Sequence, residues 1–447
     1  MSTADSFSYD LDSLKSLARD VLRIAAAQGA TSAEVDLSES VGQSVSVRRG
    51  EVETIEYNRD KGVGVTVYVG KRRGHASTAD LSRVALEDTV RAALSIATHT
   101  AEDDCAGLAD ADLLARDVPD LDLFHPWDLP VEDAIEIARR CEAAALAVDP
   151  RIGNSEGATV GAHVGHSVYA NSLGFLGGFP ASRHSISCSV VAGKGDDMQR
   201  DDWYTLSRVP GELESPESVG RRAGERTVGR LGSRKIATTK CPVLFEAPIA
   251  ASILGHFAGA VSGGSLYRKS SFLLDALGQQ VFAPHVHIRD LAHVPRGIAS
   301  SAYDDEGVAT HDRDIVSAGV LQGYFLGSYS ARKLGMRSTG NAGGTHNLRM
   351  EATGEDFATL LKRLGTGLLV TEMLGHGTNM VTGDYSRGAA GYWVENGAIA
   401  YPVHEITVAG NLKSMFRGIV AVGSDVLVRG SRQCGSILVD EMTVAGE

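Results

Sequence analysis

The chain has 447 residues and a formal net charge of −13, from 43 basic and 56 acidic residues. This length exceeds one typical hydrophobic core, so we expect two or three domains. The acidic balance argues against binding to nucleic acid or to an anionic membrane surface, and no segment approaches the roughly 18 apolar residues of a membrane-spanning helix.

Cysteine usage and the N-terminal sequence indicate a cytoplasmic protein. The five cysteines are odd in number and widely spaced, and no Cys-x-x-Cys motif occurs, which argues against a disulfide framework or a zinc knuckle. The first residues are polar and do not form the apolar core of a signal peptide.

The first 100 residues predict a domain of helices and antiparallel strands. An amphipathic helix is expected over 11–28 and a second helix over 80–97. Alternating apolar residues predict four strands between them, with turns near 49–50 and 59–62. These strands are expected at 33–39, 44–49, 52–57 and 63–69.

An acidic linker is predicted over 101–125, followed by a middle domain over 126–235. The segment from 101 to 122 carries eight acidic residues and one basic residue, as expected for a solvated connection. In the middle domain, one helix is expected to begin at Pro130 and another after the capping residue Ser215. Strands are expected at 158–170, 183–192 and 202–207.

The C-terminal domain, 236–447, is glycine-rich and is predicted to consist mainly of strands. Repeated glycine turns from 375 to 445 favour curved sheets or a barrel-like body, with helices at 248–262 and 355–364. The fold class is therefore α+β, with a helix-and-sheet N-terminal half and a β-dominated, barrel-like C-terminal half.

The helix over 248–262 contains a single histidine, His256. Zinc peptidases often place two histidines on one helix, with a glutamate beside the first that acts as base on the metal-bound water. No ligating side chain lies three, four or five residues from His256 on either side. One imidazole cannot hold zinc, so the sequence predicts no metal site on this helix.

Several long runs of the sequence resemble the TldD/PmbA family. The longest extends from Asn379 to Met415, and shorter ones are Gly-Gly-Ser-Leu-Tyr-Arg-Lys-Ser at 263–270, Asp-Asp-Glu-Gly at 304–307 and Ser-Thr-Gly-Asn at 338–341. In this family, TldD-type chains carry His-Glu-x-x-x-His on a helix and a later cysteine, which together hold the metal. PmbA-type chains, also called TldE, lack the helix motif.

The metal motif is degenerate in this sequence. Its window falls on residues 255–260, where Gly255 and Ala260 take the two histidine positions and His256 takes the glutamate position. Cys434 is a possible retained ligand position. The chain therefore resembles the PmbA/TldE branch, and no catalytic or metal-ligating residue is predicted in it.

The resemblance implies a non-catalytic partner subunit of a TldD/TldE-type cytoplasmic metalloprotease that cleaves unfolded or flexible peptides. The TldD-type chain would supply the zinc, and this chain, without a cofactor of its own, would shape the peptide channel. Candidate channel residues are His256, Asp384 and Arg387. The expected partners are a TldD-type chain and unfolded peptides, with a possible homodimer in isolation.

Two alternatives stay open. One is a regulatory protein without a role in proteolysis, such as a modulator of a topoisomerase or of a toxin–antitoxin system. The other is an autonomous homodimeric peptidase that uses other metal ligands.

Overall fold

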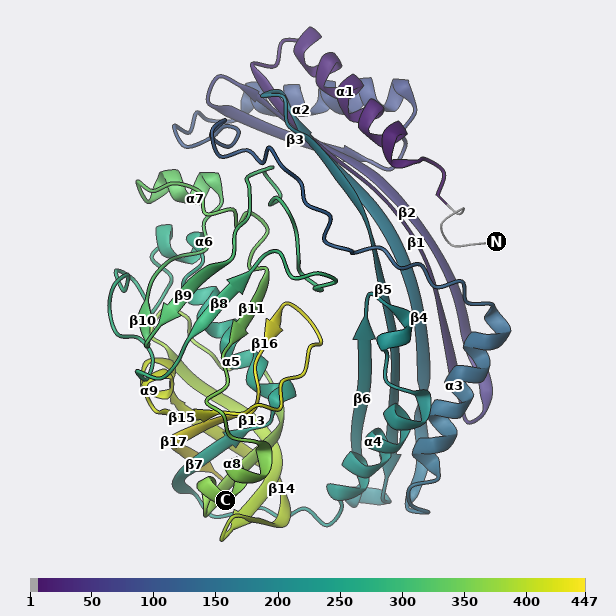
Figure 1. Ribbon diagram of the computed structural model, residues 1–447, viewed down its shortest axis with the longest axis vertical. Coiled ribbons are helices and arrows are strands. Elements are labelled where there is room, and N and C mark those ends of the chain that lie inside the picture. Colours follow the sequence, from purple (N-terminus) through teal and green to yellow (C-terminus); the bar gives the residue numbers. More distant parts are fainter. Residues whose placement is uncertain (1–6, 447) are drawn as a thin grey trace.

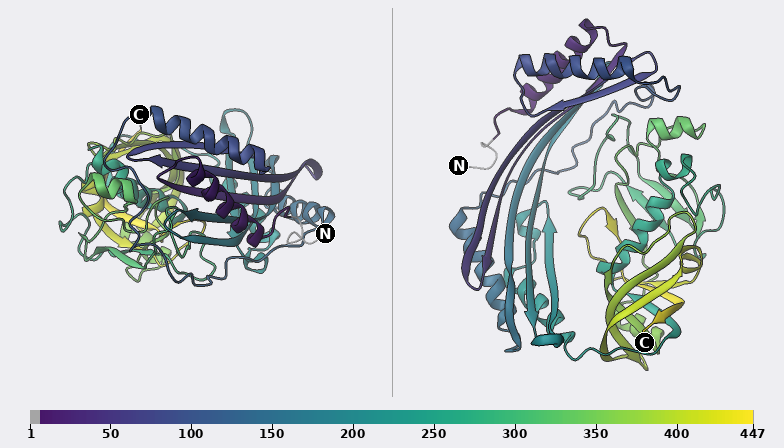
Figure 2. Two further views of the ribbon diagram at one scale, coloured as in Figure 1. Left: turned by 90° about the horizontal axis from the view of Figure 1, so that it is seen from above. Right: turned by 180° about the vertical axis from the view of Figure 1, so that it is seen from behind.

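A computed structural model describes residues 7–446 and shows two halves that lie side by side (Figure 1). One half is a long, bowed sheet with helices, and the other is a compact body rich in strands. The two halves also lie beside each other in the view from behind (Figure 2). The predicted α+β class, with a barrel in the C-terminal half, is confirmed.

The bowed sheet contains six antiparallel strands in the order β3-β2-β1-β4-β5-β6. It crosses the predicted boundary between the first and the middle domain, because β1 pairs with β4. The domain boundaries themselves stay a prediction. The strands are β1 (Ser32–Arg48), β2 (Glu51–Val69), β3 (Arg72–Thr78), β4 (Ile152–Asn171), β5 (Leu176–Ala192) and β6 (Gln199–Ser207).

The first two strands are longer than the sequence pattern predicts. The turn at Arg49–Gly50 is confirmed, with φ of 54° and 77°. The second turn, predicted near 59–62, is wrong, because β2 pairs with β1 without interruption through this region. Gly62 is a strand residue opposite Ser38, and at Gly64, just beyond the predicted turn, a Cβ would lie 2.6 Å from the Asp36 carboxylate on the neighbouring strand. At Gly64 the glycine therefore marks close packing in a strand and not a turn.

Two pairs of helices pack on the bowed sheet. The pair α1 and α2 covers one end and the pair α3 and α4 covers the other, and alternate residues of β1 lie beneath both pairs, including Val35 and Val47. Predicted starts are confirmed within three residues, and the Ser215 side chain accepts a hydrogen bond from the Ser218 amide as the expected cap. The helices are α1 (Leu11–Ala27), α2 (Arg83–His99), α3 (Val131–Leu146) and α4 (Pro216–Gly229).

The C-terminal half contains a closed barrel and a second sheet. The barrel closes because β14 pairs with both β13 and β17. Its strands are β7 (Thr239–Phe245), β12 (Gly367–Leu374), β13 (Asp384–Glu395), β14 (Ala398–Asn411) and β17 (Ile437–Ala445), and β15 (Ile419–Val422) pairs with β17. The second sheet has the order β10-β9-β8-β11-β16, with β8 (Ile288–Leu291), β9 (Arg313–Ser317), β10 (Val320–Leu321), β11 (Asn347–Met350) and β16 (Arg432–Gln433).

Within residues 236–446, five helices accompany these strands. The apolar helix predicted over 248–262 is confirmed as α5, and the one predicted over 355–364 as α8. The helices are α5 (Ala247–Ala260), α6 (Gly263–Tyr267), α7 (Ser328–Lys333), α8 (Phe357–Leu364) and α9 (Leu412–Arg417). No helix among residues 7–446 is long and apolar enough to cross a membrane.

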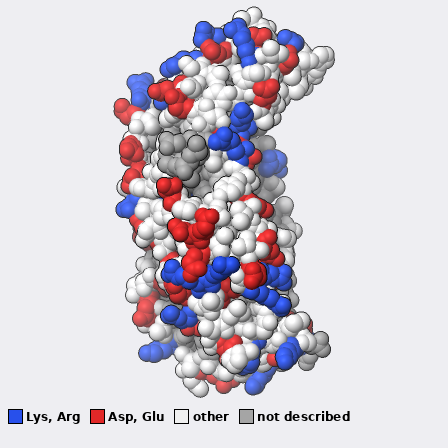
Figure 3. Space-filling view, turned by 90° about the vertical axis from the view of Figure 1, so that its right-hand side faces the viewer, with Lys and Arg blue, Asp and Glu red and all other residues white. Residues whose placement is uncertain are grey.

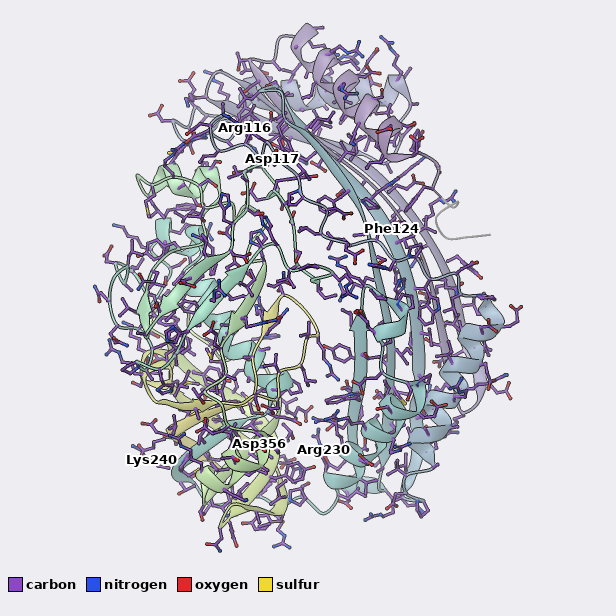
Figure 4. The ribbon with its side chains drawn as sticks, viewed as in Figure 1. Arg116, Asp117, Phe124, Arg230, Lys240 and Asp356 are labelled. Carbon is purple, nitrogen blue, oxygen red and sulfur yellow. The ribbon has the colours of Figure 1, made fainter. Side chains whose placement is uncertain are left out.

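The segment predicted as an acidic linker runs along the two halves and is held by the C-terminal half. The Arg332 guanidinium donates hydrogen bonds to the carbonyl groups of Cys105 and Gly107, and Lys333 pairs with Asp103 at 2.9 Å. Figure 4 shows Arg116, Asp117 and Phe124 along this segment. On the face seen in Figure 3, acidic and basic side chains are interspersed.

Candidate functional site

The degenerate motif lies on α5, whose apolar residues anchor it in the C-terminal core. Ile253, Leu254 and Phe257 are at most 1% exposed and belong to the largest hydrophobic cluster. Gly255 and His256 lie on the side of the helix that is only partly covered. The packing of α5 therefore fixes the direction in which side chains at positions 255 and 256 point.

An arginine fills the space next to Gly255. A Cβ added to Gly255 would lie 2.9 Å from Nη1 of Arg432, the first residue of β16. Arg432 is held beside α5 because β16 pairs in parallel with β11, with Arg432 opposite Leu348. A histidine at position 255 would therefore have to displace this guanidinium.

The imidazole of His256 packs against β13. Its ring lies edge-on to the ring of Tyr385, with the centroids 5.8 Å apart. Burial, and then the positive charges of Arg387 and Arg432, lower the pKa of His256. Its Nε2 atom is buried and has no hydrogen-bond partner among residues 7–446.

Ala260 and Cys434, the other two motif positions, are fully buried. Ala260 is 0% exposed and Cys434 is 1% exposed. Burial, with a smaller contribution from the charge of Asp425, raises the pKa of Cys434 to about 12. Among the described residues, no group of three or more His, Cys, Asp or Glu side chains is arranged to hold a metal ion.

The two candidate channel residues on β13 point to different places. Arg387 interacts with Tyr385 and His256, and its Nε atom is buried without a hydrogen-bond partner in the described chain. Asp384 is exposed and stabilises a turn, because its carboxylate accepts hydrogen bonds from Thr382 Oγ1 at 2.7 Å and Asn411 Nδ2 at 3.1 Å. The structure thus brings Arg387, and not Asp384, to His256.

A cleft of about 490 Å³ lies between the two halves, beside the N-terminal end of α5. One wall is β6, the edge strand of the bowed sheet, together with α4, and the opposite wall is α5, β12 and the loop before β16. Its charged lining residues are five arginines and three carboxylates: Arg200, Arg226, Arg230, Arg429, Arg432, Asp201, Asp202 and Glu372.

Two of these arginines bind carboxylates across the junction of the halves. Arg226 on α4 donates to both oxygens of Glu246, at 2.8 and 2.9 Å, and lies 3.3 Å from Asp201. Arg230 pairs with Glu372 and lies 3.5 Å from Asp201. Figure 4 shows Arg230 between the bowed sheet and the barrel.

Arg429 reaches from the C-terminal half to β6. Its guanidinium carbon lies 3.7 Å from the centre of the Trp203 ring and 4.1 Å from that of Tyr204. Successive side chains of a strand point to opposite faces, so a group that contacts both rings lies across the free edge of β6. One guanidinium nitrogen of Arg429, Nη2, is buried and has no hydrogen-bond partner among residues 7–446.

No pattern in the sequence predicted this cleft. Arg429 and Arg432 stand in a short segment of ordinary composition, and Trp203 and Tyr204 lie in a segment predicted only as a strand. Arg429 contacts Trp203 and Tyr204 although these residues lie more than 200 positions apart in the sequence. Sequence periodicity carries no information about such tertiary contacts.

Comparison with known proteins establishes the family. Models of PmbA/TldA metallopeptidase domains match residues 33–97 (domain 1), 124–231 (central domain) and 238–446 (C-terminal domain). A relative, metalloprotease PmbA of Escherichia coli O157:H7, is 52% identical over 93% of this chain and 92% of its own. The chain belongs to the PmbA branch of the TldD/PmbA metallopeptidase family.

Other relatives agree with this assignment. A PmbA homologue from Haemophilus influenzae is 49% identical over 94% of both chains. A crystal structure from Bacteroides thetaiotaomicron, described as a candidate modulator of DNA gyrase, has a TM-score of 0.92 and 29% identity, and covers 97% of this chain and 99% of its own. TldE of Thermococcus kodakarensis has a TM-score of 0.82 at 17% identity, over 96% of this chain and all of its own, so it supports the fold alone.

Proposed function

We propose that this chain is the non-catalytic partner subunit of a TldD/TldE-type metalloprotease that cleaves unfolded peptides in the cytoplasm. The observation that carries the proposal is the guanidinium of Arg432 in the space beside Gly255, where the family motif places a zinc ligand. A TldD-type chain would supply the zinc and its bound water.

The residues at the degenerate motif do not fit a zinc ion. Zinc needs three or four protein ligands, and neither Gly255 nor Ala260 offers a donor atom. Cys434 would have to lose its thiol proton to bind zinc. Burial makes this unfavourable, because it raises the pKa of Cys434 to about 12. The positive charge of Arg432 would also repel a metal cation.

The cleft supports a role in holding peptide. Its volume of about 490 Å³ is within the usual range for ligand sites, and β6 presents its unpaired edge to it. An extended peptide can add to such an edge through main-chain hydrogen bonds, which give affinity with little demand on sequence. That mode suits a protease for unfolded substrates of varied sequence.

The proposal is tested by co-expression with a TldD-type chain. We expect a stable heterodimer that contains zinc and cleaves an unstructured peptide, while this chain alone shows neither zinc nor cleavage. Zinc at about one ion per chain in the isolated protein would favour the autonomous peptidase instead. Elution of the two chains as separate species at micromolar concentration would rule out the partnership.

One comparison supports a second candidate function. The Bacteroides neighbour is described as a candidate modulator of DNA gyrase. A regulatory role without proteolysis would be favoured by a complex with a topoisomerase, or by direct DNA binding that weakens steeply with salt.

A further inference from the structure

The cleft carries two arginines whose charge no carboxylate of the described chain neutralises at close range. Arg226 and Arg230 are matched by Asp201, Glu246 and Glu372, as described above. Arg200 pairs with Glu156 at 3.0 Å. Arg429 and Arg432 form no ion pair within 4.0 Å in residues 7–446, which is notable in a chain of net charge −13.

Two aromatic rings hold the guanidinium of Arg429 in place. Contact with the Trp203 and Tyr204 rings fixes its guanidinium, so little side-chain entropy is left to lose when it binds a ligand. A buried donor without a partner is unfavourable, and Nη2 of Arg429 is such a donor. The nearby Asp202 does not satisfy it, and burial followed by repulsion from Asp201 raises the pKa of Asp202.

The position of Arg429 suits the end of a peptide. A strand added to β6 from Arg200 onward meets the guanidinium of Arg429, which lies across the strand edge at Trp203–Tyr204. A terminal carboxylate placed there would face Arg429 and also Arg432, which lines the same wall of the cleft three residues further along the chain.

We infer that Arg429 and Arg432 form a carboxylate-binding site that captures the free C-terminus of an extended peptide. The inference rests on the proposed function, since it requires peptide in the cleft. Guanidinium groups bind carboxylates through paired, charge-assisted hydrogen bonds, and these are among the stronger polar contacts in proteins. The site therefore selects chain ends without selecting sequence.

The test compares three unstructured peptides of one sequence, binding to the full-length chain by fluorescence anisotropy. One has a free C-terminus, one is C-terminally amidated, and one is amidated with an internal glutamate. We expect the free acid to bind at least about tenfold more tightly than either amide. Competition by inorganic phosphate reports whether the site accepts any small anion, and we expect phosphate to displace the free acid only weakly.

Substitution of each arginine tests whether it causes the tighter binding of the peptide with a free C-terminus. Arg432→Met should abolish most of the advantage of the free acid, and Arg429→Met should do the same. Arg432 is exposed, so its replacement leaves the core intact and carries the test if Arg429→Met fails to fold. The matched control is Arg289→Met, which removes an exposed arginine of the second sheet, paired with Asp314 and outside the cleft.

The outcomes separate the two proposals. Equal binding of acid and amide, or a preference that survives Arg432→Met, overturns the carboxylate site while leaving the peptide-binding role intact. If the amidated peptide with the internal glutamate binds as tightly as the free acid, the site binds any carboxylate. That result overturns the selection of chain ends. Failure of all three peptides to bind overturns the carboxylate site and the peptide-holding role of the cleft, whereas the partnership with a TldD-type chain is decided by the co-expression test.

Discussion

At the level of single residues, Gly255 and Arg432 carry the proposal that this chain holds no zinc. The glycine removes a ligand, and the arginine fills the space that the ligand would need and adds a positive charge. Restoring the motif sequence alone therefore does not restore the geometry around it, because metal-binding histidines are normally oriented by hydrogen bonds from neighbouring side chains.

Restoring the motif should give little zinc binding. The triple variant Gly255→His, His256→Glu, Ala260→His places an imidazole against Arg432 and another in a fully buried position, at a cost of about 1–3 kcal/mol for each overpacked site. Adding Arg432→Ala should raise zinc affinity by about tenfold or more, because it removes both the clash and the charge. Zinc titration by calorimetry compares the two variants, and strong zinc uptake with peptidase activity in the triple variant would contradict the account.

Cys434 should be an inert thiol in the folded protein. Its pKa of about 12 leaves very little thiolate at neutral pH, and the side chain is 1% exposed. Timed alkylation followed by peptide mass mapping should modify the partly exposed Cys105 first and reach Cys434 only in denaturant. Rapid labelling of Cys434 under native conditions would indicate a reactive role.

At the level of elements, α4 and α5 are joined by buried charges. Arg226 lies between Glu246, which precedes α5, and Asp201 on β6, and the three side chains are 16%, 21% and 11% exposed. Removing one partner of such a group leaves the others buried and uncompensated.

Arg226→Ala should lower the free energy of unfolding by about 3 kcal/mol. The control is Arg23→Ala on α1, whose arginine pairs with Asp20 in an exposed position and should cost at most about 1 kcal/mol. Urea denaturation measures both. A cost for Arg226→Ala no larger than that of the control would show that this network does not stabilise the junction.

The loop that contains Asp304 should make stability depend on pH. Burial raises the pKa of Asp304 from 3.8 to about 7, against the opposing effect of amide hydrogen bonds from Ala342, Glu306 and Val308. The folded state then binds more protons than the unfolded state between these values. The contribution to stability is complete below about pH 4 and is lost as the pH rises through 7, with a slope of at most about 1.4 kcal/mol per pH unit.

Asp304→Asn should remove this slope. The variant is expected to be less stable than the wild type at low pH, because its amide group cannot accept every hydrogen bond that the carboxyl group does. Its curve of unfolding free energy against pH should be flatter than that of the wild type between pH 4 and 7. Parallel curves would show that Asp304 titrates at an ordinary pKa.

Local signals explain which elements were predictable. Ser215 before a proline, the apolar stripe of α5 and the turn at Arg49–Gly50 each act within a few residues, so their elements were predicted correctly. Four short strands were predicted where the structure has the two long strands β1 and β2, because the length of these strands depends on pairing across the sheet, which a short stretch of sequence does not show. The motif positions were predicted from the resemblance to the family. The position of Arg432 beside Gly255 could not be predicted, because it depends on the tertiary structure.

For the whole molecule, a heterodimer should form through a large interface. An obligate contact of this kind buries on the order of 2,000 Å² or more and includes an apolar core. Size-exclusion chromatography with light scattering on the co-expressed chains should give one species with the summed mass. The isolated chain under the same conditions shows whether it is a monomer or a homodimer.

The most direct measurement is cleavage of an unstructured peptide by this chain, by a TldD-type chain, and by their mixture, each with its zinc content determined. The account predicts that full activity appears only in the mixture, with zinc contributed by the TldD-type chain and none by this one. Cleavage by this chain alone, or equal activity of the TldD-type chain with and without it, would contradict the account.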